Sequence, residues 1–319
     1  MKKLLTLVLA LALVLGLSAG ALAEEKPLVG ISVPFNPTGW VAAVEWSART
    51  TADALGLNYM MSVAENENEQ ANQIDLMISQ GCKYIVLFPH NDTLEASAQK
   101  IMDAGIVLVD FDRTLGATVP DYYLAGDNYE IGCQGAEYIA DKLGGKGKVV
   151  VTTIPSYGAI FQERVDGFMD TIKNYPEIEI LGQYAADNAA AETGLALMAD
   201  VLTANPEIDG VYSCDDELSI GMLKAIEEAG RLVEGGIKVM TGCGGAQSYM
   251  KIMDEYKDKI WLSSQTYAPY MMAECVKLAA GIIEGKTYEQ RVIIPPSTLD
   301  YTNYQQWLDE NNITADAPF

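Results

Sequence analysis

The sequence has little of what most catalytic and metal sites need. His90 is the only histidine among 319 residues. The five cysteines are Cys82, Cys133, Cys214, Cys243 and Cys275. No two of them have the short spacing of zinc ligands. Past residue 23 there is no Gly-x-Ser-x-Gly nucleophile turn, and no complete phosphate-binding glycine loop occurs. A histidine-based triad would have to use His90, so we predict no catalytic residue, no metal and no cofactor.

Positive charge is also scarce. The chain has 21 Lys and Arg against 44 Asp and Glu, which gives a net charge of −23. Nucleic acids and anionic membranes attract basic surfaces, so we expect neither as a partner. The charge bears on solubility more than on the identity of a ligand.

The one long apolar run lies at the start, in residues 4–17. It follows Met1-Lys2-Lys3 and leads to Ala21-Leu22-Ala23, the pattern of a secretory signal peptide cut after residue 23. An uncleaved membrane anchor is the alternative. No cysteine follows the run at position 21, so we predict no lipid anchor. The mature chain is expected in the periplasm or at the cell surface, where an odd cysteine count leaves at least one free thiol.

The remaining residues alternate between strand and helix patterns in two comparable runs. The expected strands are residues 28–35, 58–63, 84–89, 106–111, 122–126, 148–155, 178–184, 210–214, 237–241, 260–264 and 291–294. Helical periodicity separates most of them, and the glycine-rich turn 144–147 divides the two runs. The pattern predicts an α/β fold made of two parallel-sheet units. A (βα)₈ barrel is the structural alternative.

Residues 106–113, Ile-Val-Leu-Val-Asp-Phe-Asp-Arg, form the most informative segment. An apolar run of this kind is typical of a strand covered on both faces. Asp112 and Arg113 would then lie at the carboxyl edge of a sheet, where open α/β sheets bind ligands. A carboxylate beside a forked guanidinium suits a neutral polyhydroxyl ligand such as a sugar. A surface ion pair in a loop is the plain alternative.

Other polar and aromatic residues follow predicted strands in the same way. The candidate ligand-binding residues are Asn36, Trp40, Asp112, Arg113, Gln162, Asn188, Asp215 and Gln265. Asp216 is a further carboxylate that could cap a helix or bind a ligand. Aromatic faces stack on the C–H surfaces of sugar rings, while carboxylates, amides and guanidinium groups bind hydroxyls. Each also has a purely structural alternative, since Asn36 is typical of a turn and Trp40 of an apolar core.

Several motifs, taken in order, carry a family resemblance. They are the strand and loop of residues 30–40, Asp112-Arg113, the segment 161–168 (Phe-Gln-Glu-Arg-Val-Asp-Gly-Phe), Asp215-Asp216-Glu217 and Gln265. With them the chain resembles the periplasmic sugar-binding proteins of ABC transporters, of the ribose-binding type. That resemblance implies two Rossmann-like lobes with parallel sheets, joined by a three-stranded hinge. It places residues 24–126 and 266–296 in an N-terminal lobe, and residues 127–265 and 297–319 in a C-terminal lobe.

The resemblance also implies roles for the candidates. Asp112 and Arg113 would bind ring or hydroxyl oxygens, and Trp40, with Asn36 beside it, would be the stacking platform. Asp215 takes the place of a family asparagine and Gln265 that of a hinge glutamine, while Asp216 falls on the capping residue.

Three positions depart from the family pattern. Gln162 stands for an arginine, Asn188 for an aromatic residue, and Gly244 or its neighbour for an aspartate. These departures favour another monosaccharide, a polyol or a larger saccharide over ribose.

We therefore expect a monomeric solute-binding subunit of an ABC importer. It would close around a sugar or polyol by hinge rotation, and a membrane permease would recognise the closed form. One alternative is a secreted α/β hydrolase or lyase that uses carboxylates of the same cleft. Another is a sensor protein that presents its ligand to a chemoreceptor or a kinase. A sugar-responsive repressor would need a helix-turn-helix where the signal peptide lies.

Overall fold

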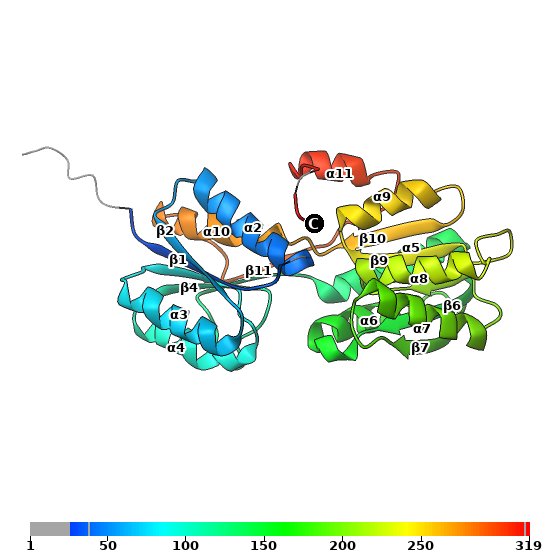
Figure 1. Cartoon of the computed structure of the whole chain (residues 1–319), viewed down its shortest axis with the longest axis horizontal. Coiled ribbons are helices and arrows are strands. Elements are labelled where there is room, and N and C mark those ends of the chain that lie inside the picture. The colour runs from blue at the N-terminus through cyan, green and yellow to red at the C-terminus, as the bar shows by residue number, and fades with distance from the viewer. Residues whose placement is uncertain (1–25, 38, 316) are drawn as a thin grey trace, which may run out of the picture.

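The computed structural model describes residues 26–37, 39–315 and 317–319, and it contains two six-stranded sheets. The predicted signal peptide, residues 1–23, lies outside these ranges. Among the helices that are described, none combines the length and the apolar character needed to cross a bilayer. Figure 1 shows the two sheets in separate lobes, each with helices packed around it.

The first sheet contains the amino-terminal strands and runs in the order β11-β5-β4-β3-β1-β2, with every pair parallel. Its strands are β1 (Val29–Pro34), β2 (Tyr59–Ala64), β3 (Tyr84–Leu87), β4 (Val107–Phe111), β5 (Tyr122–Gly126) and β11 (Arg291–Ile294). Its helices are α2 (Gly39–Ala54), α3 (Glu67–Ser79), η1 (Asp92–Leu94), α4 (Glu95–Asp103) and α10 (Met271–Ile283). Helices α2 and α10 pack together above the sheet in Figure 1, and α3 and α4 lie below it. Both faces are covered, which explains why the strands are continuous apolar runs.

The second sheet runs in the order β12-β10-β9-β8-β6-β7, and only the β10–β12 pair is antiparallel. Its strands are β6 (Lys146–Thr153), β7 (Glu177–Ala185), β8 (Gly210–Tyr212), β9 (Val239–Gly244), β10 (Trp261–Thr266) and β12 (Thr298–Leu299). Its helices are α5 (Asn128–Leu143), η2 (Pro155–Tyr157), α6 (Ala159–Ile172), α7 (Ala191–Ala204), α8 (Asp216–Glu228), α9 (Gln247–Tyr256) and α11 (Tyr304–Glu310).

Three passages of the chain join the two sheets. They follow β5, β10 and β11, since β6 and β12 lie in the second sheet and β11 lies in the first. The α/β fold with two mostly parallel-sheet lobes, predicted from the sequence, is confirmed. The barrel alternative is wrong because the strands form two separate sheets.

Helices α5 and α6 approach each other closely at two glycines. A Cβ built on Gly132 would lie 2.0 Å from the carbonyl oxygen of Arg164, and one on Gly167 would lie 2.0 Å from that of Tyr129. No side chain fits at either distance, so the pair requires glycine at both positions. This contact fixes the place of Arg164, which lies on α6 and faces the junction of the lobes.

The sequence missed two elements of the second lobe. Helix α9 follows the glycine-rich end of β9, and the two-residue strand β12 follows Pro295-Pro296. Glycine and proline disfavour regular structure locally, so α9 and β12 form because of their packing against the rest of the lobe and not because of local sequence. All five cysteines are free thiols, and four of them are buried.

Candidate functional site

Asp112 lies directly after β4, at the carboxyl edge of the first sheet, in an unusual backbone conformation. Its φ is +69°, in the left-handed region that residues other than glycine seldom adopt. The N–H of Asp112 donates to the carbonyl of Leu124 at 2.9 Å, and the carbonyl of Asp112 accepts from the hydroxyl of Tyr123 at 2.7 Å. The buried carboxylate accepts a hydrogen bond from the hydroxyl of Tyr267. Strain held by this many bonds is typical of functional positions.

Electrostatics act on the Asp112 carboxylate in both directions. Burial raises its pKa, while the Tyr267 hydrogen bond and the charges of Arg113 and Arg164 lower it. Asp110, two residues earlier in β4, is fully buried, and its oxygens have no hydrogen-bond partner among the described residues. Burial raises the pKa of Asp110 well above its usual range, and the nearby Asp112 carboxylate raises it further.

Arg113 is held by the loop that follows the neighbouring strand β3. Its Nη1 donates to the carbonyls of Pro89 at 3.2 Å and His90 at 2.6 Å, and its guanidinium lies 4.6 Å from the centre of the Phe88 ring. Its Nε lies 3.9 Å from Asp112 Oδ2. The Asp112 side chain is 4% exposed and that of Arg113 34%, so the pair is not a surface ion pair. A fixed acceptor and a partly open forked donor therefore lie side by side.

Trp40 belongs to an aromatic cluster at the junction of the lobes. Its ring lies parallel to Phe111 at 5.9 Å, stacks with Tyr267 at 5.7 Å and meets Phe88 edge to face at 5.7 Å. Its indole N–H donates to the Tyr267 carbonyl at 2.6 Å. Much of the indole is thus used by the protein itself, and its role as a stacking platform for a ligand stays a prediction. Asn36 is exposed in the loop between β1 and α2.

Arg164 is the main polar residue of the second lobe at this junction. It is 4% exposed, and its guanidinium donates to the side-chain oxygen of Asn128 at 2.9 Å and to the Cys214 carbonyl at 3.0 Å. It also lies 4.5 Å from the ring centre of Phe161 and 4.9 Å from that of Tyr267. A buried guanidinium needs such partners. It connects α5, α6 and the end of β8 to the chain segment that follows β10.

Gln162 and Asn188 are both exposed and make local bonds. The Gln162 amide donates to the Asp166 carboxylate at 2.8 Å, one turn along α6. Asn188 Oδ1 accepts from the N–H of Ala190 at 2.9 Å and from the hydroxyl of Thr193 at 2.8 Å, at the start of α7. Their predicted contacts with a ligand stay predictions.

Asp215 is the N-cap of α8. Its Oδ1 accepts from the N–H of Leu218 at 3.0 Å, which corrects the expectation that Asp216 is the capping residue. The correction is physical, because a cap needs extended backbone and Asp215 has it, whereas Asp216 is the first helical residue. Burial raises the pKa of Asp215 to about 6, against the opposing effects of its backbone hydrogen bonds and of Arg164.

Asp216 instead anchors the loop between β9 and α9. Its Oδ2 accepts from the N–H groups of Gly245 at 2.9 Å and Ala246 at 2.8 Å, and from the hydroxyl of Ser264 at 2.9 Å. Its Oδ1 has no partner among the described residues. Burial raises the pKa of Asp216 to about 7.

Gln265 is fully buried near the end of β10. Its amide donates to the Ser263 hydroxyl at 3.2 Å, and its carbonyl oxygen has no partner among the described residues. A Cβ built on Gly135 of α5 would lie 3.6 Å from that oxygen. Gln265 therefore points into the second lobe toward α5, and its contact with a ligand stays a prediction.

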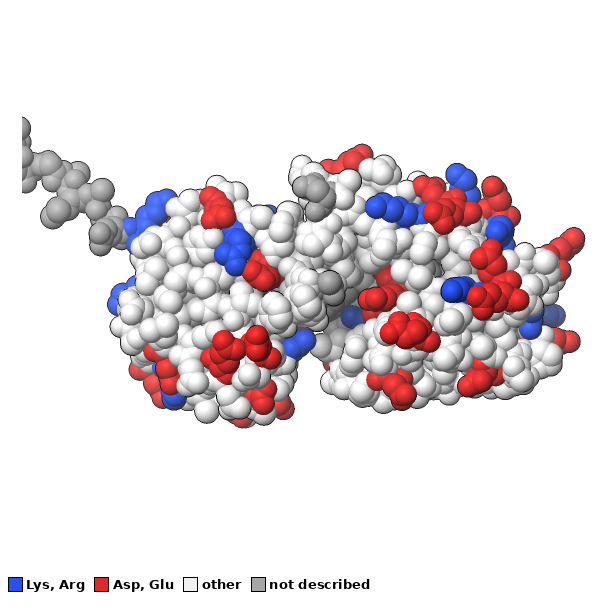
Figure 2. Space-filling model, viewed as in Figure 1, with Lys and Arg blue, Asp and Glu red and all other residues white. Residues whose placement is uncertain are grey.

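The junction joins residues that are far apart in the sequence. Asp112, Arg113 and Trp40 gather around Tyr267, and Asp215 is close enough to Arg164 to feel its charge. The sequence had not assigned a role to Arg164, Asn128 or Tyr267. Arg164 belongs to the motif of residues 161–168. Its role at the junction becomes visible only in the structure, where its guanidinium donates to Asn128. Figure 2 shows the surface hollowed between the two lobes and acidic side chains spread over both.

The side chains at this junction are suited to binding a ligand. Carboxylates, a guanidinium and aromatic rings provide acceptors, donors and flat apolar faces for a small polar ligand. The His90 imidazole is bound by the chain itself, since its Nε2 is 2.8 Å from the Ala64 carbonyl, and the main-chain N–H of His90 donates to Gln70 Oε1. Within the described ranges, no group of three or more His, Cys, Asp or Glu residues could hold a metal ion.

Comparison with known proteins gives relatives along most of the chain. The ribose import binding protein RbsB of Escherichia coli (strain K12) is 31% identical over 236 residues, which cover 72% of this chain and 77% of that protein. The xylitol-binding protein of Mycolicibacterium smegmatis is 29% identical over 214 residues, covering 65% of this chain and 60% of that protein.

The fold is shared with solved structures. An ABC transporter solute binding protein from Bacillus halodurans C-125 with bound myo-inositol superposes with a TM-score of 0.77 at 20% identity, covering 91% of this chain and all of that one. The sequence also matches a family described as "Periplasmic binding protein domain" over residues 29–287. Since this match spans most of the chain, the protein belongs to the periplasmic binding protein family.

Proposed function

We propose that this protein is the solute-binding subunit of an ABC importer and binds a sugar or polyol between its two lobes. The observation that carries the proposal is the Asp112–Arg113 pair, held rigidly at the carboxyl edge of β4. It offers a charged acceptor and a forked donor side by side, the combination that neighbouring hydroxyls of a neutral ligand need. The ribose- and xylitol-binding relatives support this class of ligand.

The proposed contact set is the one predicted from the sequence. It comprises Asn36, Trp40, Asp112, Arg113, Gln162, Asn188, Asp215 and Gln265. The exposure of Gln162 and Asn188 fits residues that reach the ligand only after the lobes close. Tyr267 and Arg164 are proposed as positioning residues, since they hold Asp112 and the hinge segment in place.

Closure would move the lobes as units. The proposed lobes are residues 24–126 with 266–296, and residues 127–265 with 297–319. The three passages between the sheets would act as the hinge. A membrane permease would receive the ligand from the closed form, on the outer side of the cytoplasmic membrane.

The proposal includes no catalytic step. The family is one of solute-binding proteins. The sole histidine is engaged in a loop, which weakens the hydrolase alternative further. A sensor that presents its ligand to a chemoreceptor or kinase would use the same cleft and differ only in its partner.

A thermal-shift screen of the mature chain tests the proposal. The panel contains D-ribose, xylitol, myo-inositol, other monosaccharides and short oligosaccharides, with amino acids as controls. A ligand at a hundred times its Kd adds about 2.7 kcal/mol, enough to raise the unfolding temperature by roughly 5–10 °C. Recovery of the unchanged ligand would support binding without turnover. Stabilisation by none of the sugars or polyols, or release of a modified product, would contradict the proposal.

A further inference from the structure

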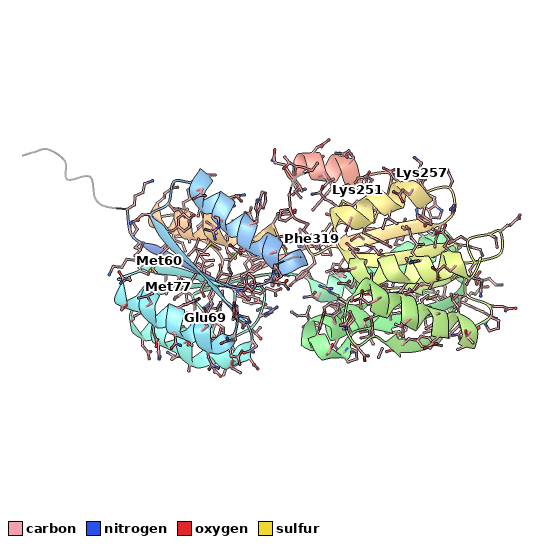
Figure 3. The ribbon with its side chains drawn as sticks, in the orientation of Figure 1. Met60, Glu69, Met77, Lys251, Lys257 and Phe319 are labelled. Atoms are coloured by element: carbon pink, nitrogen blue, oxygen red, sulfur yellow. The ribbon has the colours of Figure 1, made fainter. Side chains whose placement is uncertain are left out.

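The residues after α11 return to the junction of the lobes. In Figure 1 the carboxyl end of the chain lies between the two lobes, and Figure 3 labels Phe319 there. The buried side-chain nitrogen of Gln247, the first residue of α9, lies within hydrogen-bond distance of three main-chain oxygens, those of Thr314 at 3.1 Å, Ala317 at 3.4 Å and Phe319 at 3.0 Å. The two N–H groups of this amide therefore bind Thr314, Ala317 and Phe319 to the start of α9.

Phe319 is also bound from the other side of the junction. The hydroxyl of Tyr270 donates to the main-chain oxygen of Phe319 at 2.9 Å. Tyr270 precedes α10 and meets the ring of Trp46 on α2 edge to face at 6.1 Å. The same oxygen is therefore shared by Gln247 of the second lobe and a tyrosine that packs on the first.

The ring of Phe319 covers the end of β9. A Cβ built on Gly244 would lie 3.2 Å from Cζ of Phe319 and 3.2 Å from Oδ2 of Asp216. Gly244 has φ +140°, a conformation that favours glycine, so β9 ends without a side chain of its own. The aromatic ring occupies the space that a side chain would have filled.

This place is the carboxyl edge of a parallel sheet, the edge at which such sheets bind ligands. The N-cap Asp215 lies beside Asp216 at the same edge, and Phe319 is partly exposed. A partly exposed aromatic ring on this edge offers a flat apolar face close to the carboxylate of Asp216.

We propose that Phe319 is a specificity-determining residue and forms the apolar wall of the ligand site on the second lobe. The inference rests on the proposed function and deepens it. The ligand would turn a C–H face toward the end of β9, where Phe319 stacks on it, and present its hydroxyls to Asp112 and Arg113. This selects sugars and polyols with one face poor in hydroxyls.

Isothermal titration of the mature protein tests this inference with D-ribose, xylitol and myo-inositol as probes. Phe319→Ala is expected to weaken the tightest of these probes roughly tenfold, the factor of about 1.4 kcal/mol. Val233→Ala, which trims another exposed apolar side chain on the second lobe, is the matched control and should leave the affinity unchanged. Phe319→Leu keeps apolar volume without a flat face, so it should also weaken binding while the unliganded unfolding temperature stays constant.

The outcomes separate the two proposals. If the wild-type protein binds a probe and both Phe319 variants bind it within twofold of wild type, the inference fails and the proposed function stands. Tighter binding by Phe319→Ala would also overturn it, because the ring would then block the site. If the wild-type protein binds none of the probes, the proposed function fails and this inference with it.

Discussion

At the scale of single residues, the site depends on side chains that the protein fixes before any ligand arrives. Asp112 is held in a left-handed backbone conformation by bonds to Leu124, Tyr123 and Tyr267. Arg113 is held by two carbonyls and the Phe88 ring. Preorganisation of this kind lowers the conformational entropy that binding must overcome, which increases affinity for a small ligand.

The charge of Asp112 gives the first prediction. Asp112→Asn should weaken binding of the sugar or polyol found by the screen about 10- to 150-fold, since hydrogen bonds to charged groups contribute about 1.5–3 kcal/mol. Asparagine tolerates the left-handed backbone, so this change isolates the charge, whereas Asp112→Ala adds backbone strain. Titration calorimetry would measure the loss. Asp75→Asn, which breaks the exposed ion pair with Lys100, is the control, and equal affinities for all three proteins would refute the assignment.

Asp216 gives a prediction on pH. Its pKa is about 7 in the fold, against roughly 3.9 in an unfolded chain. Between these values the native state holds a proton that the unfolded state has lost, so the free energy of unfolding falls as the pH rises from about 4 to 7 and is level above that. The stabilising contribution of Asp216 to the free energy of unfolding is fully present below about pH 4. Asp215, with a pKa of about 6, changes the free energy of unfolding in the same direction.

Asp216→Asn should therefore reduce the pH dependence of stability. Urea unfolding at pH 5.5 and at pH 8 would show a difference that is smaller than in the wild type, by about 2 kcal/mol for a shift across 1.5 pH units. Asp75→Asn again controls for the loss of one negative charge. An unaltered pH dependence in Asp216→Asn would mean that this carboxylate is ionised throughout.

At the scale of elements, the helix pairs are built on glycine. Gly167→Ala should lower stability by about 1–3 kcal/mol or more, because a Cβ there would lie 2.0 Å from the Tyr129 carbonyl and would push α6 away from α5. Thermal unfolding would record the loss. The neighbouring Asp166→Ala lies on the exposed face of α6 and should change stability little. Equal stability of the two variants would show that the helices can separate at no cost.

Most helices and strands could be predicted from local sequence patterns, but the residues of the candidate site could be predicted only in part. Residues 106–111 predict β4 correctly because both faces of the strand are buried and the apolar run is continuous. Helix α9 was missed because it follows the glycines that end β9. Arg164, Tyr267 and Phe319 escaped notice because their partners are distant in the sequence, and no local pattern records that Gln247 binds the segment ending at Phe319.

At the scale of the whole molecule, the net charge limits which partners can bind, and the links between the lobes limit how they can move. If residues 1–23 are cleaved as predicted, the loss of Lys2 and Lys3 changes the net charge from −23 to −25. Acidic side chains lie over both lobes in Figure 2, so steering toward anionic surfaces is disfavoured and a neutral ligand is not repelled. The two lobes are linked by three chain passages, and Arg164 of the second lobe lies 4.9 Å from the ring centre of Tyr267 in the first.

This connectivity leads to a prediction about shape. A ligand can shift the lobes toward a closed arrangement only if it binds that arrangement more tightly, which requires contacts with both lobes at once. Asp112 and Arg113 on one side and Asp215 and Phe319 on the other would supply them. Small-angle X-ray scattering should then show a smaller radius of gyration when saturating ligand is added, at unchanged molecular mass. Asp112→Asn at the same ligand concentration should remain nearer the unliganded radius, and a wild-type radius that ligand leaves unaltered would mean that binding involves one lobe alone.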